Sequence, residues 1–458
     1  MYPVDEIAAF DRSAQTAALT VARRVQEEGL AAGHIIGQVR VHRVLMPWTG
    51  TKRWDGSAET FTLAEFETDQ GLVGISEGAN SNAVELAEKV VGKNPFDPSI
   101  RADMGLAYWD LAGKIAGQPL GRYLHGLCGV QAPLAQRIPL SAYTWYRFPD
   151  LDGLHEVTYE YYPDHVLFLI DQHGFQSIKL SMCDFEPQRY VELVHRIRAA
   201  VGPDIDLRVD PHASWGEAQA LRFMKEVEDC HLEWIEEPVG GYFDHIFRAG
   251  HRLRQHSSVP ISSHAWLPPL CRDAAPDRGR YGDAALHAPL NSQFLRCYQP
   301  ADISAPDAYE GPLALKRYYD TARFMGLGLG MHSAYELGPA TAVRLHIAAF
   351  AFPYESPYHI AWGNQPAPFS LHALDAHYNQ WADDIIEGGK MAYDQGFLAV
   401  PTGPGLGVTL DPERLQRYAF TDEKYQAHQR HIRNIRATHL DVLGWKRGRD
   451  GWPRYRQV

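Results

Sequence analysis

The sequence predicts an α/β fold in which a (β/α) barrel is joined to a smaller α+β domain. From about residue 137 onward, strand-like apolar segments alternate with segments of helical periodicity. Five of the strand-like segments end in an acidic or imidazole residue: Asp210, Glu236, His264, Asp307 and His332. Because the carboxyl ends of barrel strands meet at one face, this pattern predicts an active site at the mouth of the barrel.

Length and composition agree with a large two-domain enzyme. A chain of 458 residues is too long for one ordinary core, and its 45% apolar and 22% charged residues are typical of globular proteins. No apolar run approaches the roughly 18 residues that span a bilayer, and the N-terminus lacks a signal-peptide layout, so we expect a cytoplasmic protein with no membrane partner. The net charge of -12, without a basic stripe, disfavours a nucleic-acid partner. The five cysteines lack CxxC spacing, which indicates neither a disulfide framework nor a thiolate metal site.

The N-terminal part predicts a helical extension followed by the α+β domain. Residues 1–34 have apolar residues at helical spacing with Gly33 as a stop, and we expect this extension to pack or to contact another subunit. In residues 35–135, alternating polarity and a D-Q-G turn predict an antiparallel sheet. A helix follows, with one apolar face formed by Met104, Tyr108, Leu111 and Ile115.

Residues 136–394 are expected to form the barrel. Its eight predicted strands are the segments IPLSAYTWY, QSIKLSM, IDLRVDP, EWIEEP, VPISSHAW, ADISAPD, LGLGMHS and PYHIAW. An apolar stripe of Tyr190, Val194 and Ile197 predicts one intervening helix, and Ser214 with Glu217 has the spacing of a capping box at the start of another. Residues 267–297 exceed the length of an ordinary crossover, and because they follow a strand we expect them to cover the catalytic face as a lid.

Several motifs in order resemble the enolase superfamily, and within it the mandelate racemase and glucarate dehydratase-like subgroup. They are the helix AYWDLAGKIAGQPLGRYL, the strand ends IKLS, VDP and WIEEP, the segments around Asp307 and His332, and the late segment FLAVPTGPGLGVTLD. The resemblance covers nearly the whole chain from about residue 36. It implies a modified TIM (β/α) barrel with an α+β capping domain formed by N-terminal and C-terminal segments, to which residues 395–458 return.

The resemblance also implies a divalent metal. Removing a proton next to a carboxylate creates a dianionic enediolate, which needs fixed positive charge, and oxygen ligands suit Mg²⁺. Asp210 and Glu236 match the first two metal ligands of the family, and the third position is His264. An imidazole there favours Mn²⁺ or another divalent transition metal over Mg²⁺, unless His264 binds substrate or forms a structural hydrogen bond.

For the acid-base residues, His332 with Asp307 resembles the His-Asp dyad of the subgroup. The aspartate would orient the imidazole and raise its basicity. Lys179 matches the first lysine of the family's K-x-K motif, which helps to neutralise the substrate carboxylate, whereas Ser181 stands in place of the second lysine. Because serine is a weak base near neutral pH, two-base racemisation is disfavoured and one-base dehydration is favoured.

Six residues complete the expected substrate site. His359 matches a substrate-contacting histidine of glucarate dehydratase-like proteins, although a packed strand histidine is the competing interpretation. His212 stands where the family often has Asn, and either supports a neighbour or donates a proton. Basic and aromatic residues near position 50 suit an anionic polyol, unless they form only an exposed hairpin loop. The expected substrate-binding set is His359, His212, Ser181, Tyr143, Trp48 and Arg53.

The leading interpretation is a metal-dependent hydro-lyase that converts an aldonate or aldarate into its 2-keto-3-deoxy product. A racemase, epimerase or cycloisomerase of the same superfamily is the second. A non-catalytic protein that binds a sugar acid is the third, because Ser181 and His264 alter two usually functional positions together. In each case the expected partner is a small acid sugar, and the protein is expected to be a homo-oligomer.

Overall fold

The computed structural model describes part of the chain, and the statements below concern that part. The described residues are 33–46, 60–79, 81–127, 134–144, 162–181, 187–240, 243–263, 301, 303–304, 312, 327–333, 336–351, 374–439, 445–447 and 453–455. The predicted extension over residues 1–34, except its last two positions, and the predicted lid over residues 267–297 lie outside this part. So does the predicted eighth strand, PYHIAW.

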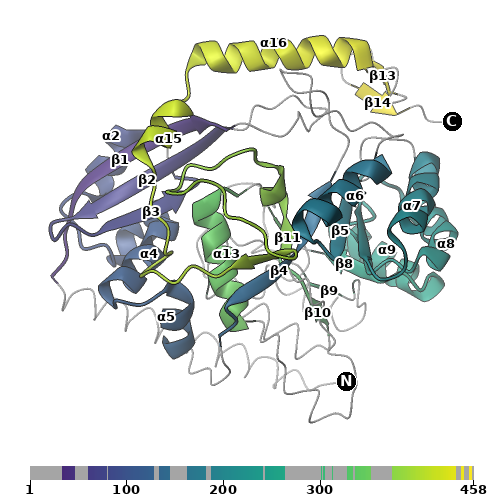
Figure 1. Ribbon diagram of the computed structural model, residues 1–458, viewed down its shortest axis with the longest axis horizontal. Coiled ribbons are helices and arrows are strands. Elements are labelled where there is room, and N and C mark those ends of the chain that lie inside the picture. Colours follow the sequence, from purple (N-terminus) through teal and green to yellow (C-terminus); the bar gives the residue numbers. More distant parts are fainter. Residues whose placement is uncertain are drawn as a thin grey trace.

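A three-stranded antiparallel sheet forms one side of the molecule (Figure 1). Its strands are β1 (Ile36–Leu45), β2 (Thr60–Thr68) and β3 (Val73–Glu77), and the predicted D-Q-G segment joins β2 to β3. Helices α2 (Ala83–Val90), α3 (Arg101–Met104), α4 (Leu106–Ile115) and α5 (Leu120–Leu127) follow. The single helix expected around Met104 is in fact two, because Gly105 has a φ of 53° and breaks it.

Parallel strands fill the centre of the molecule, in the order β10-β9-β8-β7-β6-β5-β4-β11. Seven of the eight predicted strands are present, as β4 (Arg137–Thr144), β5 (Ser177–Ser181), β6 (Asp206–Asp210), β7 (Trp234–Glu236), β8 (Ile261–Ser263), β9 (Ile303–Ser304) and β10 (Gly328–Leu329). The strand beside β4 is β11 (Leu374–Ala376), which the sequence analysis did not predict. A short antiparallel strand, β12 (Phe397–Ala399), also pairs with β4.

Helices flank these strands, as the alternating pattern predicts. They are α6 (Tyr162–His173), α7 (Pro187–Val201), α8 (Glu217–Glu226), α9 (Phe243–His256) and α13 (Gly338–Ala351). The stripe predicted on α7 is confirmed, because Tyr190, Val194 and Ile197 are fully buried. The predicted capping box is wrong: Gly216 is the N-cap of α8, and the Ser214 hydroxyl instead bonds the Pro211 carbonyl.

The C-terminal segment runs back along the three-stranded sheet. Leu45 N donates to Tyr418 O at 2.8 Å, and Phe420 N donates to Arg43 O at 2.8 Å. The short helix α15 (Pro412–Arg417), the 18-residue helix α16 (Asp422–His439) and a hairpin of β13 (Trp445–Arg447) and β14 (Pro453–Tyr455) follow. Figure 1 shows α15 beside β1 and β2, and α16 extending from it across the top of the view. The predicted domain boundaries themselves stay a prediction.

A buried aspartate ties this segment to the rest. Asp110 in α4 accepts Leu406 N at 2.8 Å through Oδ1 and Ile75 N at 2.9 Å through Oδ2. Gly405 packs so closely here that a Cβ would lie 2.1 Å from Asp110 Oδ1, so only glycine fits. Within the described part, no helix is both long enough and apolar enough to cross a bilayer.

Candidate active site

Side chains from neighbouring strands meet at the carboxyl end of the parallel sheet. In the β4–β5 ladder Tyr143 lies opposite Lys179, and in the β5–β6 ladder Ser181 lies opposite Asp210. Glu236 is the last residue of β7. All five side chains are buried. The strand ends predicted from the sequence therefore converge on one place.

Two carboxylates at this place share one cation. Lys179 Nζ lies 2.7 Å from Glu236 Oε1 and 3.2 Å from Asp210 Oδ2, and none of the three side chains is more than 3% exposed. The Tyr143 ring is 5.0 Å from the same ammonium. Two buried carboxylates at one point attract positive charge, and the close approach of Lys179 to both agrees with this.

Asp210 is held in its ionised form. Burial by itself raises the pKa of the Asp210 carboxyl. The charges of His212 and Lys179 and the backbone N–H of His212 lower this pKa by more than burial raises it, so the pKa lies well below its usual range. The N–H of His212 donates to Asp210 Oδ1 at 2.9 Å. Asp210 therefore offers anionic oxygen atoms at neutral pH.

Tyr143 and His212 lie beside Asp210 and contact each other. The Tyr143 hydroxyl donates to Asp210 Oδ2 at 2.9 Å and lies 2.8 Å from His212 Nε2. Because a phenol carries one proton, its oxygen accepts from Nε2, and His212 is then protonated at that nitrogen. Ser181 Oγ lies 3.3 Å from the same nitrogen. Three predicted substrate-binding residues therefore adjoin a predicted metal ligand.

Backbone strain fixes the turn after β6. His212 and Ala213 have φ values of 50° and 54°, in the left-handed region that costs L-residues about 1–2 kcal/mol each. Ala213 N donates to Glu237 O at 2.8 Å, which clips this turn to the one after β7. A Cβ at Gly240 would lie 2.1 Å from Ala213 O, so glycine is required for this close approach.

His332 reaches the site from the segment that follows β10, the strand at the opposite end of the strand order from β4 and β11. Its Nε2 lies 3.8 Å from Glu236 Oε1, and its side chain is 17% exposed. It shares this oxygen with Lys179, so an imidazole and an ammonium both approach one carboxylate. Nearby, Ser333 Oγ donates to Glu336 Oε2 at 2.6 Å, and Arg344 Nη2 donates to Met331 O at 3.2 Å, which restrain the segment on either side of His332.

Two amide side chains that the sequence analysis did not identify support the site. Asn379 Oδ1 accepts Tyr143 N at 3.2 Å, its Nδ2 donates to Tyr143 O at 3.2 Å, and Gln380 Nε2 donates to the same carbonyl. Both belong to η4 (His377–Gln380), which directly follows β11. Asn379 and Gln380 belong to no sequence motif and lie far from Tyr143 along the chain. Their contact with Tyr143 becomes visible only once β11 is seen to pair with β4.

The remaining predicted site residues lie outside the described part. They are His264, Asp307, His359, Trp48 and Arg53. The structure therefore brings together seven predicted residues: Tyr143, Lys179, Ser181, Asp210, His212, Glu236 and His332.

The donor set fits a divalent cation. Asp210 and Glu236 are buried, come from neighbouring strands, and already lie within 3.2 Å of a single positive charge on Lys179. Carboxylate oxygens are the ligands that Mg²⁺ and Mn²⁺ prefer.

The chain matches the family model described as enolase C-terminal domain-like over residues 163–264 and 299–414. A probable glucarate dehydratase of Streptomyces coelicolor is 26% identical over 366 residues, which cover 78% of this chain and 73% of that protein. A D-xylonate dehydratase of Haloferax volcanii is 22% identical, covering 79% of this chain and 86% of that protein. An N-succinyl-L-Arg/Lys racemase of Bacillus cereus is also 22% identical, covering 77% and 89%.

Solved structures support the same fold. An enolase from Pseudomonas fluorescens, with bound magnesium, potassium and tartrate, superposes with a TM-score of 0.66 at 18% identity, covering 89% of this chain and 97% of that one. This likeness bears out the barrel with a capping domain that the sequence predicts.

Proposed function

Because this chain belongs to the enolase superfamily, in its mandelate racemase and glucarate dehydratase-like subgroup, we propose that it is a metal-dependent hydro-lyase acting on a sugar acid. The substrate would be an aldonate or aldarate, and the product its 2-keto-3-deoxy acid. The observation that carries the proposal is the convergence of Asp210, Glu236, Lys179 and His332 at one buried point. Two relatives named dehydratases support the same reaction class.

Asp210 and Glu236 would hold the metal, with His264 as the proposed third ligand. When bound, a divalent ion stabilises the negative charge that develops on the substrate carboxylate. Lys179 adds a fixed ammonium beside the carboxylate oxygens of Asp210 and Glu236. The Tyr143 hydroxyl fixes the orientation of the Asp210 carboxylate, as outer hydrogen bonds do at metal sites.

His332 would move the protons. Its imidazole abstracts the proton from the carbon next to the carboxylate, with Asp307 as the proposed orienting partner. The resulting imidazolium then returns that proton to the departing β-hydroxyl, which leaves as water. The enol that remains tautomerises to the 2-keto acid, so atoms and charge balance with a single base.

The other site residues would recognise the polyol. Ser181 and His212 adjoin the Tyr143 hydroxyl and offer hydrogen-bonding groups to substrate hydroxyls. His359, Trp48 and Arg53 stay proposed substrate contacts on the basis of the sequence. A basic guanidinium near the barrel mouth would suit an acidic substrate.

Racemisation or epimerisation is a second candidate, and one contact favours it. Ser181 stands where the family has a second base, but His212 Nε2 lies 3.3 Å from the Ser181 hydroxyl. A second imidazole therefore lies beside the position of that missing base. One relative is named a racemase. Ser181 alone therefore does not disfavour two-base chemistry, because His212 could supply the second base.

A panel of mono- and diacid sugars in D₂O separates these functions. The enzyme loaded with Mg²⁺ or Mn²⁺ should release a 2-keto-3-deoxy acid from at least one sugar. Deuterium incorporation with inversion at the α-carbon, without loss of water, would instead establish the racemase. Binding of an acid sugar with neither exchange nor product would leave only the non-catalytic interpretation.

A further inference from the structure

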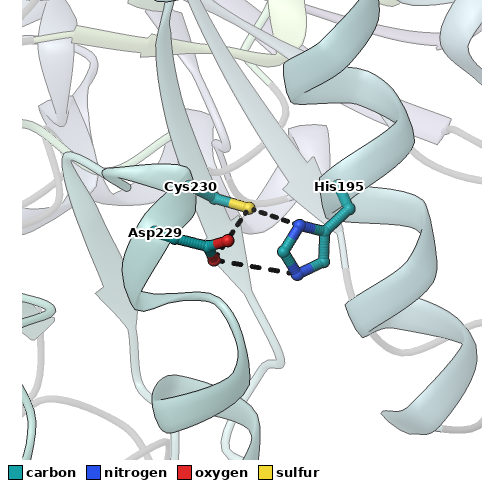
Figure 2. Close-up of side chains that lie close together, drawn as sticks. All are labelled: His195, Asp229 and Cys230. Atoms are coloured by element: carbon teal, nitrogen blue, oxygen red, sulfur yellow. Dashed lines mark hydrogen bonds and ion pairs between the residues drawn. The ribbon is translucent and has the colours of Figure 1, made fainter.

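A second group of metal-ligating side chains lies at the other end of the barrel. His195 comes from α7, and Asp229 and Cys230 come from the short helix η2 (Glu228–Cys230). Helix η2 precedes β7, whereas Glu236 ends that strand. The group and the candidate active site therefore lie toward opposite ends of β7. Figure 2 shows the three side chains pointing toward one another.

The two ligand-atom pairs that include the sulfur are close to the spacing that one tetrahedral ion imposes, and Asp229 Oδ1 lies 3.8 Å from the other imidazole nitrogen, Nε2. His195 Nδ1 lies 3.2 Å from Cys230 Sγ, and that sulfur lies 3.9 Å from Asp229 Oδ1. One ligand atom from each residue falls within 4.8 Å of the other two. With Zn–S near 2.3 Å and Zn–N near 2.0 Å, ligand atoms on one zinc ion lie roughly 3.3–3.6 Å apart. Side-chain shifts of less than about an ångström would bring the sulfur contacts to this spacing.

The imidazole is oriented as a metal-bound histidine is. His195 Nε2 lies 3.0 Å from Glu226 O, a carbonyl that can only accept a hydrogen bond, so this nitrogen carries the proton. Nδ1 is then the unprotonated nitrogen, and it faces the sulfur. Histidine ligands commonly donate their other N–H to a backbone carbonyl in this way.

Arg198 holds the two elements in this arrangement. It lies one helical turn after His195 and donates to Cys230 O at 2.8 Å, and to Gly202 O and Ile205 O at 2.7 Å each. Access is available, because the His195 and Asp229 side chains are 41% and 76% exposed.

The thiol is not suited to nucleophilic chemistry. Burial, and then the Asp229 carboxylate, raise the pKa of Cys230 to about 11, so the group is a thiol at neutral pH. Without an ion, the contact with His195 is an S–H···N hydrogen bond. An ion would replace that proton.

We propose that His195, Asp229 and Cys230 form a second metal site that takes a borderline divalent cation such as Zn²⁺. One nitrogen, one sulfur and one oxygen ligand suit Zn²⁺ and Co²⁺ rather than Mg²⁺. The fourth position would be taken by water. The site would pin the α8–β7 connection to α7, and it is independent of the reaction proposed above.

Cobalt binding to the full chain tests this site. With Mg²⁺ in excess to occupy the strand-end carboxylates, added Co²⁺ should give thiolate-to-cobalt charge-transfer absorption. After dialysis, one Zn²⁺ per chain should remain, and it should raise the Tm. Cys230→Ser should lose the absorption and the retained zinc. His195→Gln and the exposed Asp229→Asn should weaken Zn²⁺ binding at least about 10-fold, since loss of an outer partner alone costs 10- to 100-fold.

Asp210→Asn is the matched control, because it removes a ligand of the other site and should keep both the cobalt absorption and the zinc. The proposal fails if wild type shows no thiolate absorption, or if Cys230→Ser matches wild type in absorption and zinc content. The Asp229 side chain is exposed, so Asp229→Asn should fold normally. The proposal also fails if this variant binds Zn²⁺ as tightly as wild type does. Loss of the absorption in Asp210→Asn would move the thiolate signal to the strand-end site and contradict it as well.

Discussion

At the scale of single residues, the site depends on how a few buried charges are paired. The sequence placed Asp210 and Glu236 at strand ends and predicted that they share one face, whereas Lys179 was identified through the family resemblance. The contact between Tyr143 and His212 was not predictable, because it depends on the left-handed turn at His212 rather than on strand register. Side-chain direction after a strand end is set by such turns, which carry no periodic pattern.

Removing the ammonium of Lys179 should expose the cost of two buried carboxylates. Lys179→Met keeps the length of the side chain but leaves Asp210 and Glu236 without it, so unfolding free energy should fall by roughly 3–5 kcal/mol. Added Mg²⁺ should recover more stability in this variant than in wild type. Urea unfolding with and without Mg²⁺ measures both effects.

Lys114→Met is the control for this prediction, because Lys114 Nζ pairs with the buried Asp110 at 2.8 Å away from the site. It should lose stability without gaining any added dependence on Mg²⁺. Equal responses of the two variants to Mg²⁺ would show that Asp210 and Glu236 do not bind the ion.

Removing the Tyr143 hydroxyl should weaken metal binding while sparing the fold. Tyr143→Phe deletes the hydrogen bond to Asp210 Oδ2, and loss of such a partner costs about 10- to 100-fold in metal affinity. Isothermal titration with Mn²⁺ gives the affinity. Ser181→Ala, which removes the 3.3 Å contact with His212 but leaves the Tyr143–Asp210 hydrogen bond in place, should change the affinity far less. Equal affinities in Tyr143→Phe and wild type would rule out this supporting role.

At the scale of elements, the strands followed the sequence closely and the helix ends did not. A strand needs only its apolar run and its flanking turns, so β4 to β8 lie where the pattern placed them. Helix starts depend on competition between local hydrogen bonds, and Ser214 bonds Pro211 O instead of capping α8. The pairing of β11 with β4 was missed because Leu374–Ala376 has an aspartate at its centre and forms no apolar run that would predict a strand.

Helix α13 begins on a buried acid from another element. Glu77, at the end of β3, accepts Leu337 N at 2.9 Å and Ala340 N at 3.2 Å. Burial raises the pKa of Glu77 to about 8, and the charges of Glu336 and Asp384 nearby act in the same direction. Asp384, which accepts Gly338 N, has its own pKa raised by burial to about 6.

The pH dependence of stability follows from these directions. The folded protein binds the Glu77 proton more tightly than the unfolded chain, so this contribution to stability is full below about pH 4.5 and is lost as pH rises through about 8. Glu77→Gln cannot ionise, so its Tm should gain on wild type between pH 6 and 8, above the range where Asp384 titrates. The corresponding gain in unfolding free energy of Glu77→Gln relative to wild type should reach a few kcal/mol, at about 1.4 kcal/mol for each pKa unit.

Thermal unfolding at pH 5, 6.5 and 8 measures this difference. Glu85→Gln, which removes the exposed ion pair with Lys89, should follow the pH profile of wild type throughout. Parallel pH profiles for Glu77→Gln and wild type would contradict the raised pKa of Glu77.

At the scale of the whole molecule, the order of strands and helices was the most predictable property. Alternating segments imply a parallel sheet with helices outside it, and polar residues at the strand ends then share one face. The return of the C-terminal segment to the three-stranded sheet was implied by family resemblance rather than by any local pattern. Its contacts join residues far apart in the chain, such as Asp110 and Leu406, and periodicity says nothing of such pairs.

The proposed reaction depends on the imidazole of His332, and exchange of the α-proton tests this role most directly. With the sugar acid that wild type dehydrates, His332→Asn in D₂O should lose both dehydration and α-proton exchange by at least about 10²- to 10⁴-fold, the contribution of general acid-base catalysis. Ser181→Ala should retain most of both. Normal exchange or turnover in His332→Asn would contradict the proposal, as would a loss in Ser181→Ala as large as that in His332→Asn.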